Sequence, residues 1–100
     1  MIDPKIANHA LHFAMEWGEQ FMKPTQPRLK KKHPRLTKKQ LDAYDALARG
    51  AMSVGHRYCE DHVDDCDPER LAAAVQAKFP WVNGDNLSTI YSQGMYYAHK

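Results

Sequence analysis

Long apolar runs are missing from this chain of 100 residues. No stretch approaches the ~20 apolar residues that a membrane-spanning helix needs. The first residues, MIDPKIANHALHF, also lack the charged start and apolar middle of a secretory signal peptide. We therefore expect a cytoplasmic protein that does not contact a membrane.

Cysteine is scarce as well, with only Cys59 and Cys66. In a reducing compartment two cysteines are more often free thiols or ligands than a disulfide. If one continuous helix carried both residues, they would lie two turns, or about 10 Å, apart along its axis, which is beyond disulfide reach. The sequence therefore predicts that these two cysteines are not joined.

Signatures of catalysis are also missing. The chain has neither a glycine-rich phosphate loop nor a G-x-S-x-G elbow, and many of its acidic residues gather in one charged segment that would not tune a general acid. Cys59 with His56 or His62 has the composition of a thiolate pair, but a chain this short offers little scaffold for a substrate cleft. We predict a protein without catalytic activity and without a cofactor.

The apolar content, 43% of the residues, argues for a folded chain and against disorder. A chain of this size buries roughly two thirds of the surface that its unfolded form exposes, which is enough for one core. Apolar residues recur at helical spacing, and no run alternates as a strand would. The predicted fold is all-α, a single domain of about four helices at roughly residues 3–22, 38–65, 68–79 and 86–99.

Capping residues set the expected helix starts. Asp3 and Asp67 each precede a proline, which pairs an N-cap acceptor with a residue that the first helical turn tolerates. Thr37 and Gln40 have the spacing of a capping box, and Asp85 is the expected N-cap of the last helix. On that last helix the residues predicted to face outward are Ser88, Thr89, Ser92, Gln93, Tyr96, His99 and Lys100.

The chain is organised around a basic segment, residues 23–39, which holds eight of the 14 Lys and Arg residues and no acidic residue. Its prolines, Pro24, Pro27 and Pro34, each remove a backbone donor and disfavour helix at the preceding residue. They predict an extended connector over residues 23–37. Lysines in such a segment neutralise phosphates without reading sequence, whereas the plainer alternative is a solvated loop. The residues predicted to contact nucleic acid or an acidic partner are Arg28, Lys30, Lys31, Lys32, Arg35, Lys38 and Lys39.

The last two predicted helices have the order of a helix-turn-helix, whose second helix reads bases in the major groove. On the second of these, Ser88, Ser92, Gln93 and Tyr96 can donate to or accept from bases and phosphates. A suitable apolar skeleton is formed by Val75, Phe79, Val82, Leu87 and Ile90. The turn is about one residue too long and the second helix lacks arginine, so a plain helical hairpin is the alternative.

Two groups of residues contain side chains of the kind that bind metal ions. His56, Cys59, His62 and Cys66 run as H-x2-C-x2-H-x3-C, with ligand types that zinc accepts. Four ligands along one helix cannot surround one ion, and buried cysteine also packs as a small apolar residue. A second possible chelate is formed by His9, His12 and Glu16 on a polar face. We expect no metal site, and whether His62 is a ligand or part of the core stays open.

These patterns predict a small binding protein that engages nucleic acid or a nucleoprotein assembly through the basic connector, with the C-terminal helix pair as a further contact. The alternative is a protein-binding module or inhibitor, of the kind encoded by viruses or mobile elements, or a homo-oligomer. Residues 60–69 hold six of the 12 acidic residues, and this charge separation favours partners of opposite sign at the two segments. The anchors expected for protein docking are Met15, Trp17, Met22, Trp81, Tyr96 and Tyr97.

Overall fold

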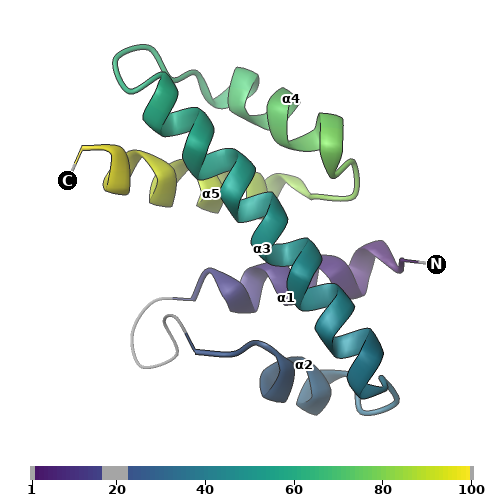
Figure 1. Ribbon diagram of the computed structural model, residues 1–100. Helices are drawn as coiled ribbons and strands as arrows, with labels where there is room; N and C mark the ends of the chain where they lie inside the picture. Colours follow the sequence, from purple (N-terminus) through teal and green to yellow (C-terminus); the bar gives the residue numbers. More distant parts are fainter. Residues whose placement is uncertain (1, 17–22, 100) are drawn as a thin grey trace.

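The computed structural model describes residues 2–16 and 23–99, and their secondary structure is entirely helical. The helices are α1 (Pro4–Ala14), α2 (Gln26–Lys32), α3 (Lys38–Asp61), α4 (Pro68–Lys78) and α5 (Gly84–Ala98). Figure 1 shows α3 running the length of the molecule, with α1 and α2 beside its first half and α4 and α5 beside its second half. The all-α prediction is confirmed, with one helix more than expected in the described part of the chain.

The additional helix, α2, lies inside the segment predicted to be an extended connector, so that prediction was wrong. Pro24 precedes α2, Pro27 occupies its first turn, and Pro34 follows its end. A proline in the first turn costs no intrahelical hydrogen bond, because the amides there have no partner within the helix. The side chain of Leu29 is fully buried and holds α2 against the rest of the molecule.

Helix α1 is shorter than predicted. Met15 is its C-cap, with its N–H directed at the carbonyl oxygens of Leu11 and His12, so the helix ends at Ala14 and not near residue 22. The apolar stripe expected to continue through Trp17 and Phe21 lies outside the described residues. Four of the five residues that α1 buries are apolar, and the helix packs mainly on α3, with smaller contacts to α2 and α5.

The predicted caps hold for three helices. Asp3 and Asp67 each accept a hydrogen bond from a backbone amide of the first turn, and Thr37 and Gln40 make both bonds of a capping box. The prediction for α5 was wrong. Its N-cap is Asn83, which accepts from the amide of Asn86, and the helix begins at Gly84, before Asp85.

Helices α3 and α5 approach each other closely at two glycines. A Cβ on Gly55 would overlap Cγ2 of Ile90, and a Cβ on Gly94 would lie 2.5 Å from Sγ of Cys59. This close approach leaves Ile90 and Cys59 with no exposed surface. Across the described residues, no helix combines the length and apolar content required to cross a membrane.

Buried amides join α1 to the second half of the chain. The Asn8 side chain donates 2.8 Å hydrogen bonds to the carbonyl oxygens of Pro4 and Trp81, and it accepts from the amide of Asn83 at 2.9 Å. The Asn86 side chain donates to Oδ1 and to the carbonyl oxygen of Asn8, at 2.9 and 3.0 Å. These bonds fix the start of α5 on α1.

Candidate functional site

The strongest concentration of positive charge lies on α2, on the turn that follows it and on the first turn of α3. Six of its cationic side chains are exposed. Lys30 is one of them, and we call the other five the basic surface: Lys31, Lys32, Arg35, Lys38 and Lys39. Helix α2 brings its lysines to its C-terminal end, where the helix dipole favours positive charge. The turn over residues 33–37 then places Arg35 between the two helices.

Two hydrogen bonds join the segment that carries the basic surface to α3 and close its turn. Thr25, which is fully buried, donates a 2.5 Å hydrogen bond to Oδ1 of Asp45 on α3. Lys30 donates from Nζ to the carbonyl oxygen of Leu36 at 2.7 Å, which closes the turn after α2. Lys30 therefore stabilises the turn and is set apart from the five cations of the basic surface.

Arg28 was predicted to bind the partner, but its guanidinium is engaged inside the protein. It donates to the carbonyl oxygen of Phe13 at 2.7 Å, forms a 3.2 Å ion pair with Glu16 and lies over the Phe13 ring. Its side chain is only 16% exposed. Arg28 joins α2 to the end of α1, and it does not contribute to the basic surface.

The charges on α3 oppose the dipole of that helix. Its first turn has no acidic residue and carries Lys38 and Lys39, while its last turn has no basic residue and ends in Glu60 and Asp61. Each such charge is unfavourable by about 0.3–1 kcal/mol at an exposed position. The Lys38 ammonium lies 3.2 Å from Asp42, but this pair is solvent-exposed and contributes little to stability. The lysines at this end of α3 therefore do not stabilise the helix.

Two histidines lie at the edge of the basic surface. His9 Nδ1 and His33 Nε2 are 2.8 Å apart and the two rings are stacked, so at least one ring must be neutral for the hydrogen bond to form. Burial, followed by the nearby charges of Lys32 and His33, lowers the pKa of His9 below 6.5. Acidification thus adds positive charge beside Lys32 and weakens the contact between α1 and the end of α2.

A hollow of about 430 Å³ adjoins the same edge. Ile6 and Leu36 supply apolar lining, while Lys32 and Arg35 are at its margin with His33. An apolar recess beside cations suits a ligand that combines a flat or apolar group with a phosphate. Sequence reasoning missed this hollow because Ile6 is far along the chain from Lys32.

The residues predicted on the last helix do not join this surface. Gln93 was expected to face outward, but it is 1% exposed and donates a 2.5 Å hydrogen bond to the carbonyl oxygen of Met15. Ser88, Ser92 and Tyr96 are exposed on α5, as expected. Ser88 borders a hollow that is also lined by Glu69 of α4, so this face carries negative charge and lies on the half of the molecule away from α2.

The apolar skeleton proposed for a helix-turn-helix is largely inside the protein. Val75, Val82 and Ile90 are buried, and Phe79 and Leu87 are partly buried against the core. Any packed helical hairpin would show this pattern. The first turn of α5, which would enter the groove, instead packs on α1 through Asn86. The basic surface is therefore the better candidate for nucleic-acid contact.

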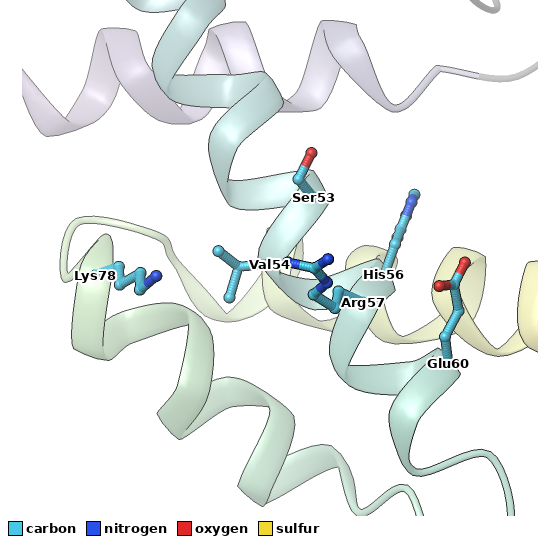
Figure 2. A pocket seen from close by; sticks show the side chains of 6 residues that line it. All are labelled: Ser53, Val54, His56, Arg57, Glu60 and Lys78. Atoms are coloured by element: carbon cyan, nitrogen blue, oxygen red, sulfur yellow. The ribbon is translucent and has the colours of Figure 1, made fainter.

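A second hollow, of about 520 Å³, lies between α3 and α4 (Figure 2) and is lined by Ser53, Val54, His56, Arg57, Glu60 and Lys78. Figure 2 shows Lys78 reaching from α4 toward Val54 and Arg57, while Ser53 and His56 project away from α4. Burial lowers the pKa of His56, and nearby Glu60 partly opposes this effect. Because Glu60 offsets the positive charges, this hollow has no strong preference for an anion.

The four residues that the sequence offered as zinc ligands, His56, Cys59, His62 and Cys66, are not arranged around one point. The His62 ring stacks on the Tyr58 ring, and Nδ1 of His62 lies 3.0 Å from the carbonyl oxygen of Tyr58. His62 thus lies against the protein. Over residues 2–16 and 23–99, no group of three or more His, Cys, Asp or Glu side chains is arranged to hold a metal ion. The two sulfurs, however, are 3.6 Å apart. The predicted separation of about 10 Å was wrong, because α3 ends at Asp61 and the chain turns back.

Over the described residues, the fold and the basic surface together define a small all-helical protein with a cationic face. Neither protein-family models, nor curated proteins, nor solved structures yielded a match to this chain. Its function therefore has to be inferred from the chemistry of the surface.

Proposed function

We propose that this protein is a small non-enzymatic binding protein that engages the phosphate backbone of nucleic acid, alone or within a nucleoprotein assembly, through the basic surface. The observation that carries the proposal is a set of five exposed cations on one segment, residues 23–39, that contains no acidic residue. Lys38 and Lys39 also oppose the dipole of α3, so their positions are not explained by helix stability. Binding of a polyanion explains them.

The expected mode of binding is contact with phosphates and not recognition of base sequence. Four of the five cations are lysines, which act as point charges, whereas base reading favours the bidentate geometry of arginine. The hollow lined by Ile6 and Leu36 would receive a sugar or an unstacked base next to a bound phosphate. We therefore expect similar affinity for duplexes of different sequence.

A salt titration tests this proposal. If four cations contact phosphates of a duplex, the affinity should fall roughly 100-fold between 50 and 200 mM salt. Fluorescence anisotropy with two labelled duplexes of unrelated sequence provides the measurement. The absence of binding at 50 mM salt, to single strands as well as duplexes, would show that the proposal is wrong.

Charge reversal tests which surface is used. The triple variant Lys31→Glu, Lys32→Glu, Arg35→Glu should lose binding at low salt while keeping its helical circular dichroism. The matched control reverses the same number of charges elsewhere on exposed residues, with Arg57→Glu, Arg70→Glu and Lys78→Glu. If the control variant loses as much affinity as the first, net charge and not the basic surface governs binding.

The competing function, a protein-binding module or inhibitor, has less support from the described residues. Of the expected anchors, Met15 is 2% exposed and Trp81 is partly buried, while Trp17 and Met22 lie outside the described residues. In the part of the chain that the structure describes, the exposed large apolar side chains are Ile2 and Tyr96. Affinity capture from the native host, with and without nuclease, separates the two functions, because a protein partner would survive the nuclease.

A further inference from the structure

The turn between α3 and α4 brings the two cysteines together. Helix α3 ends at Asp61, and the amide of His62 donates to the carbonyl oxygen of Tyr58 at 3.0 Å. Residues 62–65 then form a turn, so Cys66 lies back against the last turn of α3. The result is a distance of 3.6 Å between Sγ of Cys59 and Sγ of Cys66.

The two thiols differ in their access to solvent. Cys59 has no exposed surface and lies against Gly94 of α5, whereas Cys66 is only partly buried. Burial raises the pKa of Cys59 to about 12, so this residue stays protonated at neutral pH. A reagent from solvent therefore meets Cys66 first, because thiol reactivity requires both access and a thiolate.

We propose that Cys59 and Cys66 form a redox-active dithiol, which a small disulfide oxidises to an intramolecular disulfide joining the end of α3 to the start of α4. Cys66 reacts first with the disulfide in solvent, and Cys59 is the resolving thiol. The hydrogen bond from the Tyr91 hydroxyl to the carbonyl oxygen of Cys66, 3.4 Å long, holds Cys66 in place from α5. Closure requires the distance between the two sulfurs to fall from 3.6 Å to about 2.05 Å.

The chemistry proceeds in two exchanges. The thiolate of Cys66 attacks one sulfur of a disulfide RSSR, the S–S bond breaks, and RS⁻ leaves as a mixed disulfide forms on Cys66. Cys59 then attacks Sγ of Cys66 and expels the second RS⁻, and the proton of Cys59 passes to this departing thiolate. Each RS⁻ takes up one proton, so the protein loses two electrons and two protons while RSSR is reduced to two RSH.

The charges beside Cys66 select the class of disulfide. Asp64, Asp65 and Asp67 lie within two residues of Cys66 in the sequence, so their Cα atoms are at most about 7.6 Å from its Cα, which is less than one Debye length. Negative charge attracts a cationic reagent and repels an anionic one. The dithiol should therefore react faster with a small cationic disulfide such as cystamine than with oxidised glutathione, which is anionic.

Mass spectrometry of the reduced full chain treated with cystamine tests the proposal. The product should have lost two hydrogen atoms, carry no cysteamine, and yield a peptide pair linked through Cys59 and Cys66. The Cys59→Ala variant should stop at the mixed disulfide on Cys66, while Cys66→Ala should stay unreacted. A wild-type product that keeps cysteamine on Cys66, or that links two chains, would overturn the proposal.

Acid quenching of the wild-type reaction gives the order of events without any variant. The mixed disulfide on Cys66 should appear first and then decay to the internal disulfide, whereas an adduct on Cys59 would contradict the assignment. The closed loop contains eight residues, so oxidation should raise Tm by about 10 °C. An unchanged or lowered Tm would show that the folded protein does not hold the sulfurs in a disulfide-compatible arrangement.

The charge selection is tested by comparing the two reagents at low salt. Cystamine should react roughly ten times faster than oxidised glutathione, and the ratio should fall in the Asp64→Asn, Asp65→Asn variant and at high salt. Equal rates for the two reagents would contradict the charge selection. Because the readout is covalent and uses no nucleic acid, it is independent of the proposed binding function.

Discussion

At the scale of single residues, buried amides and not apolar contacts alone connect the two halves of the chain. The Asn8 side chain makes four hydrogen bonds to residues that include Trp81, Asn83 and Asn86, all more than 70 positions away. Buried polar groups of this kind are costly if one partner is removed, because the others lose their hydrogen bonds without regaining water.

Replacing Asn8 with alanine should destabilise the protein by about 2–4 kcal/mol, because it leaves the Trp81 carbonyl and the Asn83 amide without partners and removes one of the two acceptors of the Asn86 side chain. Urea unfolding followed by circular dichroism measures the change. The control is Ser92→Ala, a change at an exposed position on α5, which should stay within about 0.5 kcal/mol of wild type. A loss below about 1 kcal/mol in Asn8→Ala would mean that solvent replaces these bonds.

Histidine ionisation makes stability depend on pH. Burial is the largest cause that lowers the pKa of both His9 and His56 below 6.5, with positive neighbours adding to the effect at His9. Both therefore stay neutral to a lower pH in the folded state than in the unfolded chain, which takes up protons as the pH falls through about 6.5. Their contribution to stability is complete above that value and is lost below it.

Urea midpoints measured between pH 8 and pH 5 should therefore decrease on acidification. The double variant His9→Gln, His56→Gln should show a flatter profile than wild type, and the exposed His12→Gln variant should keep the wild-type slope. A double variant with the full wild-type slope would assign the acid sensitivity to other groups.

Several residue roles were beyond the reach of the sequence, for a shared physical reason. Asn8, Arg28 and Gln93 are polar residues on helices, and helical periodicity assigns such residues to solvent. Each instead donates a hydrogen bond to a backbone carbonyl that only the tertiary fold brings near. The exposure of lysines such as Lys31 and Lys39 was predictable, because burying an unpaired ammonium group costs free energy and this cost keeps them at the surface.

At the scale of helices, local chemistry predicted starts better than ends. The caps at Asp3, Thr37 and Asp67 depend on neighbouring residues, so the sequence was sufficient. Helix ends depend on where the chain must turn to pack, which is why α3 stops at Asp61 and brings Cys66 toward Cys59. Helix α2 is likewise stabilised by the burial of Leu29, a tertiary contact.

The first turn of α3 offers a test that separates function from stability. Glutamate in place of Lys39 complements the helix dipole, so Lys39→Glu should raise the free energy of unfolding by about 0.5 kcal/mol. The same change should weaken duplex binding, because it reverses one charge of the basic surface. Chemical unfolding and anisotropy measure the two effects on one protein sample.

The matched control is Lys78→Glu in the last turn of α4, where the positive charge is favourable. This variant should lose about 0.5 kcal/mol of stability and bind the duplex as wild type does. If Lys39→Glu lowers stability, then Lys39 has a structural role that the opposed helix dipole does not reveal.

At the scale of the whole molecule, α3 separates the two charged segments. Its 24 residues span roughly 36 Å, with the basic surface at its start and the acidic residues 60–69 at its end. The molecule is 43 Å long, so these segments occupy its two ends. At physiological salt the Debye length is about 8 Å, and the acidic end is therefore electrostatically screened from a ligand on the basic surface.

This separation predicts that equal changes of charge have unequal effects. Asp64→Lys with Asp65→Lys should alter duplex affinity less than about twofold at 150 mM salt, because several Debye lengths separate these residues from the bound phosphates. Lys31→Glu with Lys32→Glu removes direct contacts and should weaken binding at least ~10-fold. At about 10 mM salt, where screening extends to ~30 Å, the aspartate variant should begin to bind more tightly than wild type. Fluorescence anisotropy across this salt range distinguishes binding by a localised basic surface from attraction by net charge. If net charge alone governed binding, the two variants would change the affinity by similar factors at 150 mM salt.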